Sequence, residues 1–80
     1  MSRRVEDPER AYLLLVSRRV RAFRILAGLT QEELAGRAVM SRVTLGGVER
    51  GDRGAGVLTY LRLSRALGVR MGALLDEGAP

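Results

Sequence analysis

The segment 29–51, LTQEELAGRAVMSRVTLGGVERG, constrains the fold of this chain more than any other part of it. Thr30 is followed three residues later by Glu33, the pattern of a capping box, so a short helix begins there. Ser41 is the next N-cap and Gly51 the next helix terminator, which predicts a second helix between them. Because the two helices are joined so closely, they cannot lie flat against each other, and one must project from the domain.

Helical periodicity extends over most of the remaining chain. Asp7 and Pro8 form an N-cap with proline at the first helical position, and this helix is expected to run to about Ala27. A further helix is expected over 57–67, followed by one or two turns over 70–75. Alternation typical of a strand is absent from the sequence. The prediction is therefore an all-α fold, a compact bundle of five helices.

The two ends of the chain lack this periodicity. Residues 1–7 are expected to be a mobile tail and 77–80 a frayed C-terminus. Residues 8–76 are expected to form one domain, with the close helix pair at 30–50. A chain of 80 residues buries only ~60–65% of the surface that its unfolded form exposes, so a partner subunit would add stability.

The residue types exclude several classes of function. The chain has no cysteine and no histidine, which removes disulfides, thiolate metal ligands and the usual imidazole base. The adjacent acids Glu32 and Glu33 are explained by their place at a helix N-terminus. We therefore expect no enzyme activity, no metal and no cofactor. No apolar run approaches the ~18–20 residues of a membrane span, so we expect no membrane partner and a cytoplasmic location.

Positive charge is concentrated in the middle of the chain. The formal charge is +5, and all fourteen basic residues are arginine. Between Arg10 and Arg70 there are twelve arginines and four acids, which gives a local charge of +8. Arginine suits bidentate recognition of phosphate and guanine, although a GC-rich genome is an alternative cause of the arginine bias. A basic body of this kind favours polyanions as partners.

The close helix pair resembles the helix-turn-helix of Cro- and phage-repressor-like regulators, the xenobiotic-response-element family. The resemblance covers about residues 16–75. The matching residues are GLTQEELA at 28–35, then Ala38, Ser41, Arg42, Thr44, Leu45, and VERG at 48–51. The resemblance implies a lambda-repressor-like fold, double-stranded DNA as partner, and a homodimeric transcriptional regulator, of the repressor or controller type, associated with a prokaryotic nucleoid. A form similar to LGGVERG is common in controller proteins of restriction–modification systems.

The second helix of the pair is the one expected to read DNA, because side chains of its first turn reach base edges when it enters the major groove. Arg42 can bond guanine O6 and N7 together. A phosphate contact or a solvated side chain is the alternative for Arg42. Val43 or Thr44 can touch a thymine methyl, or can simply cover the helix surface. The expected base-reading residues are Ser41, Arg42, Val43, Thr44 and Gly47.

Phosphate contacts are expected at a helix start and at exposed arginines. Gln31 lies in the first turn of its helix, where free backbone N–H groups and the helix dipole favour an anion. A solvated helix start is the alternative. Arg50 and Arg53 flank the end of the reading helix. Arg21 completes the set, and its alternative is a solvated charge on the first helix.

The resemblance also implies an ion pair between Arg24 and Glu49 that joins the first helix to the reading helix. A pair of this kind, if half-buried, contributes more to fixing geometry than to net stability.

Two positions depart from the family pattern. Val39 stands where the family usually has glycine, and valine strains a left-handed backbone, so the turn geometry is expected to differ. Gly46 and Gly47 lie inside the reading helix, where each costs ~1 kcal/mol relative to alanine. They would allow a closer approach to DNA, or shift specificity onto fewer residues and onto DNA shape.

Apolar residues beyond those needed for one core predict a subunit contact. The expected residues are Leu58, Leu61, Leu74 and the run 13–15. The same surplus leaves a second class of function open, an antitoxin-like or adaptor module whose main partner is another protein.

Overall fold

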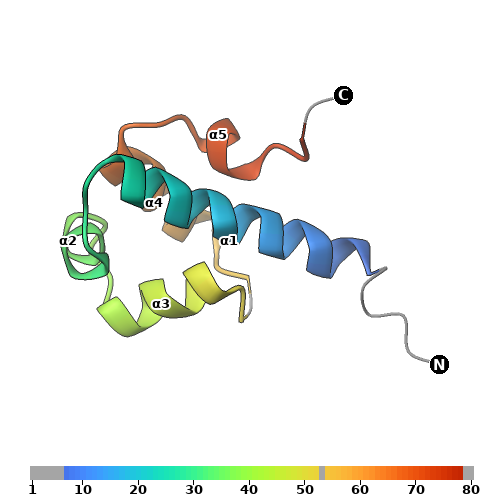
Figure 1. Cartoon of the computed structure of the whole chain (residues 1–80), viewed down its shortest axis with the longest axis horizontal. Helices are drawn as coiled ribbons and strands as arrows, with labels where there is room; N and C mark the ends of the chain where they lie inside the picture. The colour runs from blue at the N-terminus through green and yellow to red at the C-terminus, as the bar shows by residue number, and fades with distance from the viewer. Residues whose placement is uncertain (1–6, 53, 79–80) are drawn as a thin grey trace.

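The computed structural model describes residues 7–52 and 54–78, and all regular secondary structure in these ranges is helical. The helices are α1 (Pro8–Leu26), α2 (Gln31–Arg37), α3 (Arg42–Arg50), α4 (Val57–Leu67) and α5 (Met71–Leu75). Figure 1 shows α1 crossing the middle of the molecule, with α3 on one side of it and α5 on the other. The predicted all-α bundle of five helices is confirmed. The expected tail at 1–6 and the chain end at 79–80 lie outside the described residues.

Side chains that the sequence marks as caps begin α1 and α3. Asp7 Oδ1 accepts hydrogen bonds from the backbone N–H groups of Glu9 and Arg10 at 3.0 and 3.4 Å. Asp7 therefore belongs to the start of α1, and its assignment to a mobile tail is wrong. Ser41 Oγ accepts from the backbone N–H of Thr44 at 3.0 Å, which confirms the predicted start of the reading helix. None of the described helices is long and apolar enough to cross a membrane.

The turn between α2 and α3 contains a left-handed valine. Val39 has φ 57°, and no other non-glycine residue among those described has a positive φ. The N–H of Met40 donates to the Ala35 carbonyl at 2.9 Å, and the N–H of Val39 donates to the Gly36 carbonyl at 3.3 Å. These two bonds are those of a Schellman motif, which usually has glycine at the left-handed position. The expected change of turn geometry is therefore wrong, because the valine adopts the conformation that glycine would have taken.

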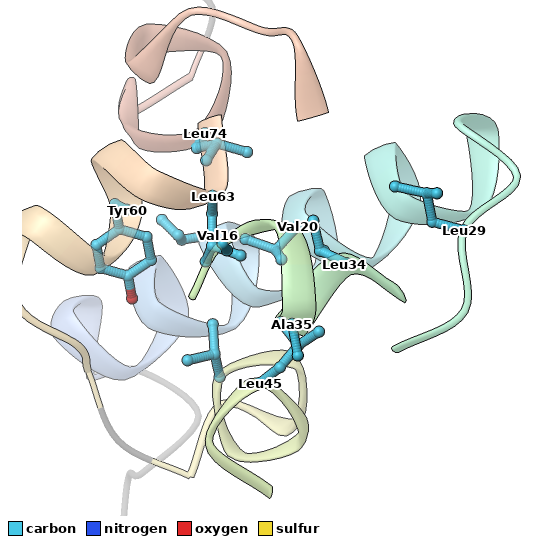
Figure 2. Packing of buried hydrophobic residues seen from close by; sticks show 11 residues of the cluster. Val16, Val20, Leu29, Leu34, Ala35, Leu45, Tyr60, Leu63 and Leu74 are labelled. Carbon is cyan, nitrogen blue, oxygen red and sulfur yellow. The ribbon is translucent and has the colours of Figure 1, made fainter. Parts of the chain in front are cut away.

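The core draws on all five helices and on the segment between α1 and α2 (Figure 2). Its buried apolar residues are Val16, Val20, Leu29, Leu34, Ala35, Ala38, Leu45, Val48, Tyr60, Leu63 and Leu74. Ala27, the C-cap of α1, and Val57, the first residue of α4, lie at helix ends and are exposed.

Leu74 is fully buried within the chain's own core, with an exposed fraction of 0%. Its predicted contact with a second subunit is therefore wrong, because its side chain offers no surface to a partner. Leu58 is 59% exposed and Leu61 is partly exposed. All three residues of the run 13–15 are half-buried.

Replacing Val39 with glycine is expected to stabilise the chain, because glycine adopts a positive φ without a clash of Cβ with the backbone. The relieved strain of about 1–2 kcal/mol exceeds the entropy that glycine adds to the unfolded chain, about 0.4–1 kcal/mol. A gain of about 0.5–1 kcal/mol raises the melting temperature of a domain this size by about 2–8 °C. Thermal unfolding followed by circular dichroism measures it.

Val43→Gly is the matched control, because Val43 is 77% exposed and Val39 is 79% exposed. Val43 lies inside α3 with helical backbone angles, where glycine is less favourable than valine. The control is expected to lower the melting temperature. If Val39→Gly lowered it as well, the valine would not be strained.

Candidate nucleic-acid interface

The helices α2 and α3 cross at a steep angle and leave one side of α3 open. Figure 1 views α2 almost along its axis, while α3 lies across the view and runs antiparallel to α1. The inner residues of α3, Leu45 and Val48, are buried in the core. The four residues at its start, 41–44, are all exposed. The helix is thus divided lengthwise into a packed side and a free side.

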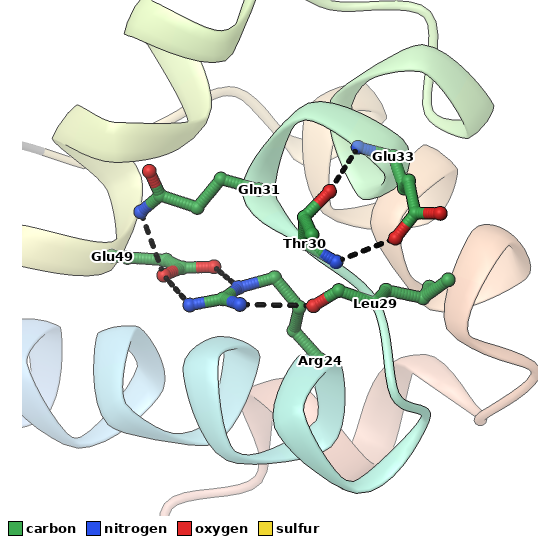
Figure 3. A network of polar contacts seen from close by, with 6 residues as sticks. All are labelled: Arg24, Leu29, Thr30, Gln31, Glu33 and Glu49. Atoms are coloured by element: carbon green, nitrogen blue, oxygen red, sulfur yellow. Dashed lines mark hydrogen bonds and ion pairs between the residues drawn. The ribbon is translucent and has the colours of Figure 1, made fainter.

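A polar network joins α3 to α1 and α2 (Figure 3). Arg24 Nε donates to Glu49 Oε2 at 2.8 Å and Arg24 Nη2 to Glu49 Oε1 at 3.1 Å, so the predicted ion pair is present. Arg24 Nη1 also donates to the Leu29 carbonyl at 2.9 Å. Gln31 Nε2 donates to Glu49 Oε1 at 3.1 Å. One carboxylate therefore holds three segments of the chain at a fixed spacing.

The network is largely removed from solvent. The side chain of Arg24 is 13% exposed and that of Glu49 is 3% exposed. The hydrogen bond with Glu49 raises the pKa of Arg24 above its ordinary value, and this effect outweighs the opposing effect of burial. Arg24 therefore keeps its charge at any physiological pH, and Glu49 always has a cationic partner.

The start of α2 is set by the predicted capping box (Figure 3). The Thr30 N–H donates to Glu33 Oε1 at 2.8 Å, and the Glu33 N–H donates to Thr30 Oγ1 at 3.0 Å. The backbone hydrogen bond from Thr30 lowers the pKa of Glu33 below its ordinary value, because it stabilises the ionised carboxylate. The box determines where α2 begins and hence where Gln31 meets Glu49.

The end of α3 is fastened to α1. Gly51 has φ 70°, and a Cβ at this position would lie 2.9 Å from Leu14 Cδ2 and 3.2 Å from Ser17 Oγ. A larger residue would therefore have to displace the side chain of Leu14, and it would also be strained at this positive φ. Arg10 Nη1 donates to the Gly51 carbonyl at 2.6 Å and satisfies one of the free carbonyls at this helix end. The reading helix is thus held through Glu49 and Gly51 together.

The predicted base-reading residues lie together on the free side of α3. Ser41, Arg42, Val43 and Thr44 are exposed, and Gly47 is half-buried one turn further along. Ser41 Oγ donates to Thr44 Oγ1 at 2.8 Å, so the hydroxyl hydrogen of Ser41 is already used while that of Thr44 is not. The guanidinium of Arg42 and the methyl groups of Val43 remain directed to solvent.

The predicted phosphate contacts differ in their surroundings. Gln31 uses its amide N–H on Glu49, and Arg50 pairs with Asp52 at 3.0 Å. Arg21 is exposed on α1. Arg53 lies outside the described residues.

Sequence reasoning assigned no role to Arg10 or Asp52. Asp52 lies two residues beyond Arg50, a spacing that does signal a local ion pair at a helix end. The contact of Arg10 with Gly51 spans 41 residues, and no sequence signal points to it.

A helix pair of this geometry, with one side of the second helix exposed on a basic all-α domain, defines a helix-turn-helix domain. Residues 20–74 match the helix-turn-helix family. The chain therefore belongs to this family, in its xenobiotic-response-element branch of DNA-binding transcriptional regulators.

Two solved structures are similar to this fold. The restriction-modification controller protein C.AhdI from Aeromonas hydrophila has 38% identity and a TM-score of 0.77, over 80% of this chain and 97% of that chain. The hypothetical transcription factor NHTF from Neisseria has 30% identity and a TM-score of 0.76, over 80% of this chain and 74% of that chain. No curated protein sequence matches this chain.

Glu49→Ala is expected to destabilise the fold by about 3 kcal/mol, because it leaves the charge of Arg24 largely buried without its partner. The loss also removes the bond to Gln31 and so frees α3 to shift relative to α2. Urea unfolding measures the change in the free energy of unfolding.

Asp52→Ala is the matched control, since it also removes a carboxylate paired with an arginine of this domain. The side chains of Arg50 and Asp52 are 64% and 54% exposed, and an exposed pair contributes less than about 1 kcal/mol. If both variants lowered the free energy of unfolding equally, burial of the Arg24–Glu49 pair would not increase its contribution to stability.

Proposed function

We propose that this chain is a sequence-specific transcriptional regulator that binds operator DNA as a homodimer and acts at the DNA of a prokaryotic cell. This proposal rests on the difference between the packed side and the exposed side of α3. Its inner side is held by the core, by Glu49 and by Gly51, while its first turn is exposed. A rigid helix with a free N-terminal turn is the arrangement that places side chains in a major groove.

Direct base reading falls first on Arg42 and Val43. Arg42 is a bidentate donor for guanine O6 and N7, and Val43 presents an exposed apolar group to a thymine methyl. Thr44 still has its own hydroxyl hydrogen and a methyl group to offer, whereas Ser41 can donate to DNA only if its hydrogen bond to Thr44 breaks. Gly47 has no side chain, so it can contribute only by allowing the backbone of α3 to approach the bases.

Phosphate contacts are proposed for Gln31, Arg21, Arg50 and Arg53. Arg21 and Arg50 are exposed cations on the described surface, and Gln31 lies at the start of α2 beside α3. Each phosphate that is neutralised releases counterions, so binding is expected to weaken as salt rises. The likeness to a restriction-modification controller protein supports a small regulator of the same kind.

Selection of bound sites from a random duplex library tests the proposal. The wild-type chain is expected to recover a palindromic consensus, because two copies related by a two-fold axis bind two half-sites about 34 Å apart. Arg42→Ala is expected to lose preference at one base position of each half-site, by about 1–3 kcal/mol. An equal loss for all sequences would make Arg42 a phosphate contact, and a flat salt dependence would argue against DNA binding.

The subunit contact is proposed to lie on α4, through Leu58 and Leu61. Leu58 is 59% exposed and Leu61 is partly exposed, so an apolar strip of α4 is available on the surface. A large exposed apolar side chain is more favourable when a second copy covers it.

Leu58→Asp is expected to convert a dimer into a monomer and to weaken operator binding, because it places a charge in an apolar contact. Ile25→Asp is the control: Ile25 is 54% exposed, but it lies on α1 outside the proposed contact. Sedimentation equilibrium distinguishes the two states. A wild-type chain that stays monomeric at tens of micromolar would contradict the proposed dimer.

A further inference from the structure

The reading helix contains a pair of glycines that its fold does not explain. Gly46 and Gly47 lie inside α3, away from its ends, and both have ordinary helical angles. Alanine at such positions would favour the helix. Among the residues that the structure describes, the atoms within 4 Å of a Cβ built at either glycine belong to Arg50 and Asp52, so neither glycine packs closely against a neighbouring described helix. The reason for glycine therefore concerns those two residues.

Arg50 lies across the place where a side chain of residue 46 would stand. A Cβ at Gly46 would lie 3.1 Å from Arg50 Nη1, closer than ordinary van der Waals contact. A Cβ at Gly47 would lie 3.8 Å from Arg50 Nη2 and 3.9 Å from Asp52 Oδ2, which is ordinary contact. Gly46 is buried even though it does not belong to the apolar core. Alanine at 46 would therefore move the guanidinium of Arg50 by a few tenths of an ångström, whereas alanine at 47 would meet it at an ordinary contact distance.

Asp52 holds the guanidinium in this position. Arg50 Nε and Nη2 donate to Asp52 Oδ2 at 3.1 and 3.0 Å. The backbone of Asp52 is itself attached to α3, because its N–H donates to the Gly47 carbonyl at 3.2 Å. The carboxylate occupies one edge of the guanidinium and leaves the donors of Nη1 and the second donor of Nη2 available.

Arg50 and Asp52 share an open cavity with the proposed base-reading residues. Val43, Thr44 and Gly47 line the same cavity, beside the start of α4. A guanidinium held in this place adds a cation to the part of the reading side where α3 has no side chain of its own.

We propose that the absence of a side chain at Gly46 makes room for the guanidinium of Arg50, which Asp52 holds in place. Arg50 is then a specificity-determining residue of α3, in place of the side chain absent at 47. This inference rests on the proposed DNA-binding function. The chemistry that Arg50 recognises is a pair of hydrogen-bond acceptors on the DNA, either guanine O6 and N7 or two phosphate oxygens. Because the side chain is already placed before binding, less of its freedom is lost in the complex.

Gly46→Ala and Gly36→Ala form a matched pair that tests this arrangement. Both replace a glycine inside a helix, α3 or α2, so both are expected to melt no lower than the wild type. Alanine at 46 moves the guanidinium of Arg50, whereas no atom of the described residues lies within 4 Å of a Cβ at 36. Gly46→Ala is expected to weaken binding to the duplex selected by the wild-type chain about fivefold, which is about 1 kcal/mol and the lower end of the range for a bidentate arginine contact. Gly36→Ala is expected to change it less than twofold, which is about 0.4 kcal/mol.

The Arg50→Ala background shows whether the effect passes through Arg50. Gly46→Ala is expected to have no further effect there. Loss confined to one base position identifies guanine as the acceptor, and equal loss on the selected duplex and on a scrambled duplex of the same composition identifies phosphate. Equal affinities of the two glycine variants, or a Gly46→Ala loss that persists without Arg50, would overturn the proposal.

A measurement without DNA separates this inference from the proposed function. The Nε–H signal of Arg50 in a nitrogen–proton spectrum is expected to shift in Gly46→Ala and to stay unchanged in Gly36→Ala. If the wild-type chain selected no duplex, the DNA-binding function would fail and the role of Arg50 in specificity would fail with it. If the wild-type chain selected a duplex but the two variants bound it equally, only the proposed role of Gly46 in placing Arg50 would be contradicted.

Discussion

The carboxylate of Glu49 is the contact on which the rest of this structure depends. It accepts hydrogen bonds from Arg24 of α1 and Gln31 of α2 while it is itself part of α3. A domain of this size without cysteine has no covalent link to keep its helices at fixed angles. Apolar packing alone tolerates small rotations of a helix, because Leu45 and Val48 can be repacked. In a charged network, rotation of one helix breaks hydrogen bonds between groups that are largely removed from solvent, and water does not replace those bonds.

The second support of α3 works by shape and not by charge. Gly51 lets the chain turn within contact distance of Leu14 and Ser17, and Arg10 bonds to its carbonyl. Both supports act on the C-terminal half of α3, and the N-terminal half is held by Leu45 and by the short turn through Val39. The exposed first turn therefore belongs to a rigid body, which is what discrimination between bases requires.

Local signals in the sequence explain why so much of this fold was predictable. The starts of α1, α2 and α3 each depend on one side chain close to the backbone N–H groups that it bonds, at Asp7, Thr30 and Ser41. Such signals need no knowledge of the tertiary structure. The pair of Arg24 and Glu49 was expected only through the family resemblance, because 25 residues separate its members. The contact between Arg10 and Gly51 has neither a local signal nor a motif, and it was missed.

The remaining errors arise where local rules compete with packing. Leu74 lies in a helix of five residues, which is too short for periodicity to show which side faces the core. At Val39, local sterics disfavour the observed φ of 57°. The two hydrogen bonds that close the Schellman turn nevertheless keep the valine in this conformation.

The glycines at 46 and 47 look like defects by helix propensity. On the proposed role of Arg50, the glycine at 46 makes room for its guanidinium, four residues further on, whereas a Cβ at 47 would keep ordinary contact distances to Arg50 and Asp52. A position that lacks a side chain in the sequence of a helix can then be filled from the next turn. In that case the position along the helix would not by itself determine which residues contact DNA.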